Sequence, residues 1–220
     1  MSVRTRTTLG RWIRRGHVWL TRVAAIGPDD DLGQRFGAMG PGTFLAYPTG
    51  PIFNEHAIHL GQETLIGPNV AITAGMAPGQ PLDHSPVVVI GSRCNIGRGS
   101  HIVGHHSIVI GDDVTTGPYI YVTDQNHIYA DPDVPIRLQW PSEDPVVIGD
   151  GCWLGVGCVV LPGSRLGRNV VVAANAVVRG EVPDHCVVAG APAKVVRRLV
   201  DGSWEPPLRD VPIRPPADWA

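Results

Sequence analysis

The sequence predicts an all-β protein whose chain winds into a parallel β-solenoid. Aliphatic residues recur at every sixth position over long stretches, and a small or modest residue recurs at the fifth place of each unit. Glycine and proline are frequent, with 27 and 21 copies, as a chain with many corners requires. A period of six fits neither an amphipathic helix nor an alternating strand. It fits a short strand followed by a turn, repeated many times.

The repeated aliphatic positions define the expected interior of the solenoid. Three units close one triangular coil of about 18 residues, and equivalent residues of successive coils stack roughly 4.8 Å apart. Each fully buried aliphatic side chain contributes about 1.5 to 3 kcal/mol relative to exposure. The fifteen positions are Leu60, Ile66, Ile72, Ile90, Ile96, Ile102, Ile110, Thr116, Val122, Ile148, Leu154, Val160, Leu166, Val172 and Val178.

The rhythm breaks at three places, which predict departures from the solenoid. One loop is expected at residues 78–89, and the step from Ile102 to Ile110 predicts a bulge at one corner. After His127 the repeat stops and resumes only at Ile148, which predicts a long loop over residues 128–147. A long excursion from a rigid scaffold can shape a binding pocket, so function is expected there.

Three regions follow from these breaks. Residues 1–54 are expected to form an N-terminal basic helix and cap, residues 55–190 the β-solenoid, and residues 191–220 a short C-terminal helix and a Pro-rich tail. The tail carries Trp204 and Trp219, and we expect it to wrap a neighbour or to remain loose.

The first 26 residues contain six arginines and no acidic residue, together with apolar side chains that include Trp12 and Trp19. They predict a basic helix with an apolar side. The favoured interpretation is a helix that caps the solenoid end or packs on a neighbouring subunit, because open solenoid ends need covering. The other interpretation is weak contact of residues 1–26 with an anionic membrane surface.

Composition excludes several classes of protein. A net charge of −2 argues against a nucleic-acid binder, which would carry a strongly basic face. The sequence has no uninterrupted run of 18 apolar residues and no clean signal peptide, so we expect a cytoplasmic protein. The four cysteines are interpreted as small core residues and not as disulfides or nucleophiles; they are Cys94, Cys152, Cys158 and Cys186.

Residues 146–199 carry a specific resemblance. The segment VVIGDGCWLGVGCVVLPGSRLGRNVVVAANAVVRGEVPDHCVVAGAPAKVVRRL contains Trp153, the turn Leu161-Pro162-Gly163 and the closing AGAPAKVVR. It resembles the C-terminal half of hexapeptide-repeat acyltransferases, the group with galactoside and maltose O-acetyltransferases. The segment HIYADPDVPIRLQW is more similar to their polysaccharide- and antibiotic-modifying members. The resemblance implies a left-handed β-helix, a homotrimer with active sites between subunits, and acetyl-CoA as donor, with no metal.

The resemblance also implies roles for individual residues. His127 matches the catalytic histidine, expected here as the general base. The expected substrate-binding residues are Asp124, Asn126, His105 and His106. Asp124 and Asn126 either hold the His127 ring or complete the strand's hydrogen bonds, and His105 or His106 is expected beside His127 as an orienting or acceptor-binding group. The positions that match CoA contacts are Trp153, Val156, Ala174, Arg179, Gly180, Lys194 and Arg197. Many relatives have a lysine at the position of Gly180, and Arg179 is the expected substitute.

The sequence therefore predicts an acetyl-CoA-dependent O-acyltransferase acting on a hydroxyl of a carbohydrate or glycolipid, by direct transfer in a ternary complex. An antibiotic or serine-like acceptor, and succinyl-CoA as donor, stay open. One alternative is a zinc-dependent lyase similar to γ-class carbonic anhydrases, with His101 and His106 as ligands; the third position would be Leu65, which cannot bind zinc. The other is a catalytically silent scaffold subunit.

Overall fold

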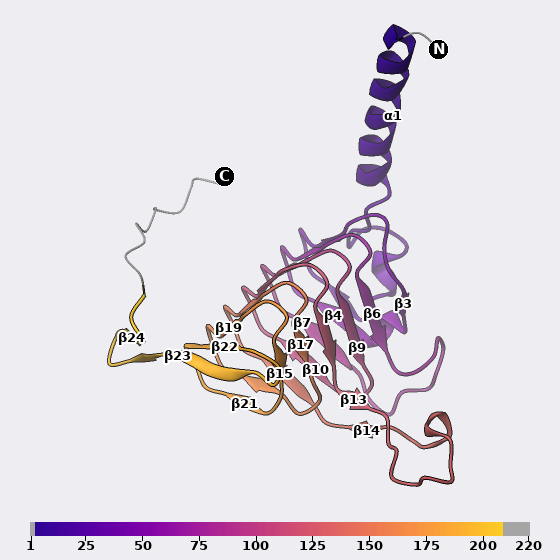
Figure 1. The fold of residues 1–220 in the computed structure, drawn as a ribbon. Coiled ribbons are helices and arrows are strands. Elements are labelled where there is room, and N and C mark those ends of the chain that lie inside the picture. Colours follow the sequence, from indigo (N-terminus) through magenta and orange to yellow (C-terminus); the bar gives the residue numbers. More distant parts are fainter. Residues whose placement is uncertain (1–2, 209–220) are drawn as a thin grey trace.

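The computed structural model describes residues 3–208, with the side chains of residues 7–208. One α-helix, α1 (Val3–Val23), precedes a solenoid whose strands form three parallel faces (Figure 1). The described chain also contains three short 3-10 helices: η1 (Gly33–Arg35) before the first strand, and η2 (Glu55–Ala57) and η3 (Ile136–Leu138) between later strands. The solenoid is a left-handed parallel β-helix.

The first face is a seven-stranded sheet and the third face a six-stranded sheet. The first consists of β1 (Ala38–Met39), β4 (Ile58–Leu60), β7 (Val88–Ile90), β10 (Ile108–Ile110), β15 (Val146–Ile148), β18 (Arg165–Leu166) and β21 (Glu181–Val182). The third consists of β3 (Ile52–Phe53), β6 (Ala71–Ala74), β9 (His101–Gly104), β12 (Tyr121–Thr123), β17 (Val159–Val160) and β20 (Val177–Val178).

The second face is a nine-stranded sheet that ends in an antiparallel hairpin. It consists of β2 (Phe44–Leu45), β5 (Leu65–Ile66), β8 (Asn95–Ile96), β11 (Thr115–Thr116), β16 (Trp153–Leu154), β19 (Val171–Val172), β22 (Cys186–Ala189), β23 (Lys194–Val200) and β24 (Ser203–Glu205). Outside the solenoid, β13 (Gln125–Asn126) pairs antiparallel with β14 (Ser142–Glu143).

The interior column agrees with the six-residue period. All fifteen predicted positions are at most 7% exposed. The strand register is the same before and after the long loop at residues 124–145, because Ile110 pairs with Ile148 and Val122 pairs with Val160. The four cysteines are buried and free, so their prediction as core residues is confirmed.

The solenoid begins earlier than predicted, so the boundary at residue 55 is wrong. Strands β1, β2 and β3 already form a coil, which places Met39, Leu45 and Ile52 on Leu60, Ile66 and Ile72. The steps within this coil are six and then seven residues, and the extra residue hides it from a strict six-residue template. The predicted loops also extend too far, because Val88 and Val146 already lie in strands β7 and β15.

The C-terminal helix predicted from residue 191 is also wrong. Within the described residues, the chain turns back after β22 as β23 and then β24, both antiparallel, and Trp204 lies in β24. The edge of β22 would otherwise expose unpaired backbone groups, and the β-branched Val195 and Val196 favour a strand. The Pro-rich tail from residue 209, with Trp219, lies outside the described residues.

Helix α1 does not cap the solenoid, so that part of the favoured interpretation is wrong. It projects away from the coils (Figure 1), and every side chain from Arg11 to Leu20 is exposed. The first coil is covered instead by the segment after the helix, in which Ile26 bridges to Leu45 and Phe36 is buried. Throughout residues 3–208, no helix combines the length and apolar content needed to cross a membrane.

Candidate active site

Three excursions leave the solenoid at one corner. Each follows a strand of the third face and returns to a strand of the first: residues 75–87 follow β6, residues 105–107 follow β9, and residues 124–145 follow β12. Because β6, β9 and β12 are neighbours in one sheet, the excursions are stacked side by side. Segments distant in the sequence therefore meet at a single place.

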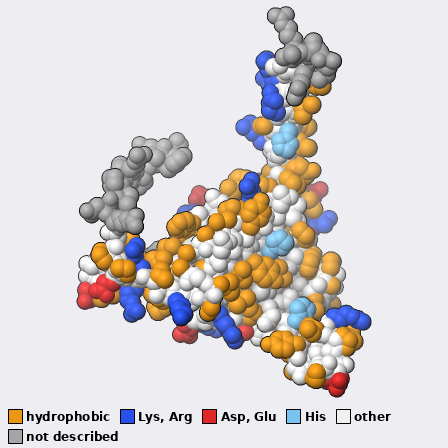
Figure 2. All heavy atoms as spheres, in the orientation of Figure 1, with side chains coloured by type: hydrophobic (Ala, Val, Ile, Leu, Met, Phe, Trp, Pro, Cys, Tyr) orange, Lys and Arg blue, Asp and Glu red, His pale blue; other side chains and the backbone are white. Residues whose placement is uncertain are grey.

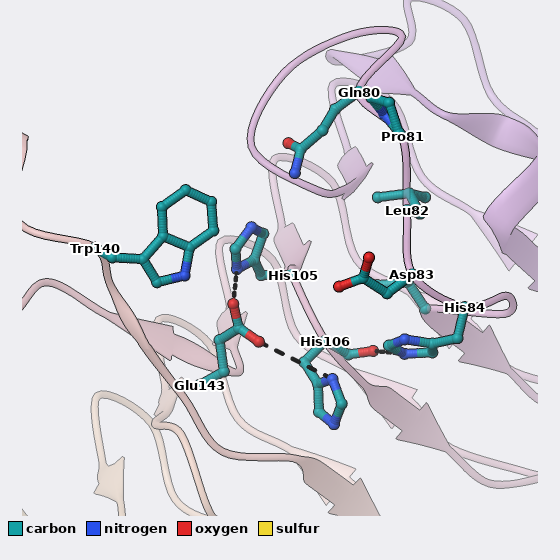
Figure 3. Close-up of a pocket in the computed structure, with 10 residues that line it drawn as sticks. Gln80, Pro81, Leu82, Asp83, His84, His105, His106, Trp140 and Glu143 are labelled. Atoms are coloured by element: carbon teal, nitrogen blue, oxygen red, sulfur yellow. Dashed lines mark hydrogen bonds and ion pairs between the residues drawn. The ribbon is translucent and has the colours of Figure 1, made fainter.

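The excursions enclose a small pocket (Figure 3). Its enclosed volume is about 60 Å³, well below the roughly 300 to 1,000 Å³ of typical ligand sites. A single chain thus surrounds only a fraction of a sugar-sized molecule. The lining residues are Gln80, Pro81, Leu82, Asp83, His84, Val87, His105, His106, Trp140 and Glu143.

A carboxylate between two imidazoles forms the centre of the pocket (Figure 3). Nδ1 of His105 lies 2.5 Å from Oε1 of Glu143, and Nδ1 of His106 lies 4.0 Å from Oε2. The His105 side chain is 4% exposed, whereas those of Glu143 and His106 are 28% and 45% exposed. The contact between His105 and Glu143 is an ion pair when the imidazole ring is protonated. Because the side chains of Glu143 and His106 are partly exposed, a molecule that enters the pocket from solvent can contact both of them.

Two aromatic contacts surround this centre. The ring of Trp140 lies 5.8 Å from that of His105, between centroids. The His84 ring meets the His106 ring edge-on at 4.8 Å, and Nε2 of His84 lies 2.5 Å from the backbone oxygen of His106. Each of the three excursions thus contributes at least one side chain to the same cluster.

Asp124 holds the bulge in place. It is 0% exposed, and its carboxylate accepts backbone N–H bonds from His105 and His106 at 2.8 Å and from Ser107 at 2.6 Å. A buried carboxylate needs such donors to offset its desolvation. The expectation that Asp124 binds acceptor or holds the His127 ring is corrected, because its side chain is buried and its oxygens are occupied by backbone donors.

His127 lies at the start of the long excursion, directly after β13. It is exposed and is not among the residues that line the pocket. Gln125 pairs with Glu143 and Asn126 with Ser142, so Glu143 lies across the β13–β14 ribbon, two residues back from His127. Asn126 is exposed as well, and no contact of its side chain tests the predicted role. The structure thus places His127 just beyond the strand that pairs with the Glu143 segment, and outside the residues that line the pocket.

The predicted CoA-contact residues fall into two groups. Val156 and Ala174 occupy stacked corners between the second and third faces, and the hairpin that carries Lys194 and Arg197 begins at the same corner, where Ala193 donates to the oxygen of Val177. Exposed Trp153 lies on the second face next to this edge. In contrast, Arg179 and Gly180 follow β20 at the corner of the excursions. The structure does not bring all seven together within one chain.

One donor near this edge lacks a partner. Nε of Arg197 is buried and has no hydrogen-bond partner among the residues that the structure describes, although Lys194 three residues earlier is exposed. An unpaired buried guanidinium donor is uncommon, and the strongest partners for such a donor are carboxylate and phosphate oxygens.

Sequence reasoning did not identify Glu143, Trp140 or His84. The sequence did indicate that the three loops leave the solenoid at the same corner. Each break in the six-residue period follows the third aliphatic position of a coil, at Ile72, Ile102 and Val122. That alignment predicts a shared corner. The period cannot indicate which side chain of a long loop faces inward, so the identity of Glu143 needs the structure.

Metal binding was the basis of the lyase alternative. Among the side chains that the structure describes, no group of three histidine, cysteine, aspartate or glutamate residues is arranged to hold a metal ion. His101 lies exposed on β9, and His106 lies in the bulge, where its ring contacts His84 and Glu143.

Two family models match the repeats. One is described as bacterial transferase hexapeptide (six repeats) and matches residues 145–180. The other is described as the hexapeptide repeat of succinyl-transferase and matches residues 87–123. The two matches flank the long excursion on either side.

Several curated proteins are similar in sequence. A protein of Escherichia coli K12 named as a lipopolysaccharide biosynthesis O-acetyl transferase, WbbJ, is 38% identical over 105 residues, 44% of this chain and 54% of that protein. Galactoside O-acetyltransferases of Lactococcus lactis and Escherichia coli K12 are 33% and 31% identical, covering 47% and 50% of this chain and 49% and 57% of their own lengths. The chain spans about half the length of the curated relatives it matches.

Solved structures share the fold. AntD, an N-acyltransferase from Bacillus cereus solved in complex with dTDP and 3-hydroxybutyryl-CoA, superposes with a TM-score of 0.63 at 16% identity, covering 79% of this chain and 90% of its own. The hexapeptide-repeat containing acetyltransferase VCA0836 from Vibrio cholerae gives a TM-score of 0.51 at 26% identity, covering 76% and 77%. The first shows the fold alone.

Proposed function

We propose, from the premise that this chain carries the repeats of the hexapeptide-repeat transferases, that it is an acyltransferase. It transfers an acetyl group from acetyl-CoA to a hydroxyl of a carbohydrate or glycolipid acceptor. The observation that carries the proposal is the stacking of three excursions at one corner, where two imidazoles flank the carboxylate of Glu143 beside the His127 segment. Relatives that match the repeats are named O-acetyltransferases, which supports a hydroxyl of a sugar as acceptor.

His127 acts as the general base in this proposal. A sugar hydroxyl is a poor nucleophile at neutral pH, so the imidazole takes its proton as the oxygen attacks the thioester carbonyl. The tetrahedral intermediate then collapses, the C–S bond breaks, and the proton passes from the imidazolium to the departing CoA thiolate. The acetyl group moves directly in a ternary complex, and the reaction requires no covalent enzyme intermediate and no metal ion. Exposure of His127 leaves its ring accessible to both substrates.

Glu143 and the histidine pair position the acceptor. The Glu143 carboxylate is partly exposed and can accept hydrogen bonds from sugar hydroxyls. Buried His105 fixes one of its oxygens, which leaves the oxygen nearer His106 for the substrate. Trp140 provides an aromatic surface beside them, of the kind that packs against the apolar face of a sugar ring.

Acetyl-CoA lies along the edge between the second and third faces in this proposal. The stacked corners at Val156 and Ala174 offer backbone groups to the pantetheine arm, with Trp153 beside them. Lys194 and Arg197 lie on β23 next to this edge and would bind phosphates, which would give the orphaned Nε of Arg197 a partner. Arg179 replaces the lysine that many relatives carry at Gly180.

A homotrimer would complete the site. The pocket of one chain is too small for a sugar, and the Arg179 corner lies apart from the Val156 edge on the same chain. A neighbouring subunit packed against the excursions would enlarge the site into a cleft and bring its own edge toward His127. Analytical ultracentrifugation of the purified protein would show a single species of three chains; a monomer at micromolar concentration that retains activity would contradict this arrangement.

The proposal is tested by incubating the protein with acetyl-CoA and a panel of galactosides, glucosides and amino sugars, and identifying products by mass spectrometry. We expect CoA and an O-acetylated sugar in equal amounts. Binding is measured separately by thermal unfolding, because a ligand at 100 times its Kd adds about 2.7 kcal/mol of stability. Failure of acetyl-CoA to shift unfolding would contradict the donor assignment. An N-acetylated product alone would overturn the hydroxyl acceptor.

A further inference from the structure

Helix α1 presents a continuous apolar face that nothing in the described chain covers. Its large apolar residues fall at intervals of three, four and seven, which places them on one side of an α-helix. They are Leu9, Trp12, Ile13, Trp19, Leu20 and Val23. All are exposed, and Trp12, Ile13, Trp19 and Val23 are exposed by 62% or more. An isolated helix in water gains little stability by itself, so such a face indicates a binding surface.

The opposite side of the helix carries arginines among uncharged residues such as Val18 and Thr21. Figure 2 shows Lys and Arg side chains along one side of the helix and hydrophobic ones along the other. No acidic residue occurs among residues 1–26, which contain six arginines; those at positions 4 and 6 have side chains outside the described part. Arg14, Arg15 and Arg22 line a shallow hollow together with Val18 and Trp19. Three guanidinium groups around one hollow attract an anionic group such as a phosphate.

We propose that α1 lies flat on an anionic membrane surface and attaches the solenoid to it. The apolar face would enter the boundary between headgroups and acyl chains, with both tryptophans at that boundary. The arginines would extend along the surface to lipid phosphates. The charge of the helix favours this occupant over a second copy of the chain, because an anionic surface complements the arginines, whereas a second copy of this helix carries the same arginines and no acidic side chain to complement them. The proposal does not rest on the acyltransferase assignment, since lipid binding requires no turnover.

The test is co-sedimentation of the full-length protein with vesicles. One set contains phosphatidylcholine alone, and the other contains phosphatidylcholine mixed with phosphatidylglycerol. We expect binding to the mixed vesicles, little binding to phosphatidylcholine alone, and loss of binding as NaCl is raised, because salt screens exposed charges. Each arginine near such a surface contributes about 1 kcal/mol, so a variant with Arg14→Gln, Arg15→Gln and Arg22→Gln should bind roughly 100-fold more weakly.

Matched variants separate the helix from the rest of the surface. Trp12→Ala should weaken vesicle binding, whereas Trp140→Ala should leave it unchanged, although both tryptophans are 66% exposed. The melting temperature of each variant confirms that the solenoid is folded. Equal binding to both vesicle types, or an arginine variant that binds as well as the unaltered protein, would overturn the proposal. So would a Trp12→Ala protein that forms smaller oligomers while neither protein binds vesicles, since the occupant would then be a second copy.

Discussion

Nδ1 of His105 lies 2.5 Å from Oε1 of Glu143, which joins the bulge after β9 to the long excursion after β12. Neither segment could form this contact alone. The bulge is fixed by Asp124, and Glu143 is fixed by the pairing of β14 with β13. The site therefore depends on two separate supports, which can be removed one at a time.

Glu143→Gln should lower kcat/KM by about 10- to 100-fold, mainly by raising KM for the acceptor. The amide keeps the shape but loses the charge that holds His105 and accepts strongly from hydroxyl groups. Steady-state kinetics with varied acceptor measures the effect. The control is Glu63→Gln, an exposed corner residue away from the pocket. An unchanged KM for the acceptor would exclude Glu143 from acceptor binding.

Asp124→Asn should destabilise the protein by about 2 to 4 kcal/mol. An amide presents one oxygen and an NH₂ group to three backbone donors, so at least one buried N–H loses its acceptor. Urea unfolding measures the change. Activity should fall as well, because His105 and His106 would no longer be held. If stability and activity both stay unchanged, Asp124 does not support the bulge.

Leu154→Asp should prevent folding, because Leu154 is 0% exposed and the substitution puts an unpaired charge into the interior column. The neighbouring Trp153 points outward and is 56% exposed, so Trp153→Asp should give a folded protein. Circular dichroism and the yield of soluble protein distinguish the two variants. A folded Leu154→Asp protein would mean that the register is wrong.

Burial raises the pKa of the Cys152 thiol to about 11 and that of Cys158 to about 12, against an ordinary value of 9.0. The folded state therefore disfavours the thiolate, and this contribution to stability is complete below pH 9.0 and declines as pH rises toward 12. Cys158→Ala should flatten that decline in the free energy of unfolding.

Iodoacetamide should not modify either thiol of the folded protein near pH 8, but should modify both after denaturation. Rapid labelling of the native protein would contradict the burial.

Periodicity was sufficient to predict the core, since side chains six apart must face inward if three short strands close one coil. It did not find the first coil, because one extra residue precedes Ile52. It also did not reveal that Lys194–Val200 turns back as a strand, since that choice depends on the free edge of β22. The first miss comes from an irregular step in the sequence, and the second from strand pairing that a single-sequence pattern does not report.

The sequence predicted where the candidate site lies in the fold, but only some of the residues that form it. His105, His106 and the long excursion were expected to share a corner, and the structure brings them together around a carboxylate. Glu143 lies within a loop that has no repeat, so no pattern distinguishes it from its neighbours Ser142 and Asp144. Asp124 was expected among the substrate-binding residues, where it would hold the His127 ring or complete the strand's hydrogen bonds. Its burial shows a supporting role.

The most direct test of the account is turnover of acetyl-CoA with a sugar acceptor by the unaltered protein and by His127→Ala, measured as acetylated product. A general base typically accelerates a reaction by roughly 10²- to 10⁴-fold, so kcat of the variant should fall by that factor. Its melting temperature should stay within a few degrees of that of the unaltered protein. His17→Ala, which removes an exposed histidine of α1, should retain full activity. Equal turnover by His127→Ala and the unaltered protein would contradict the assignment of His127 as the base.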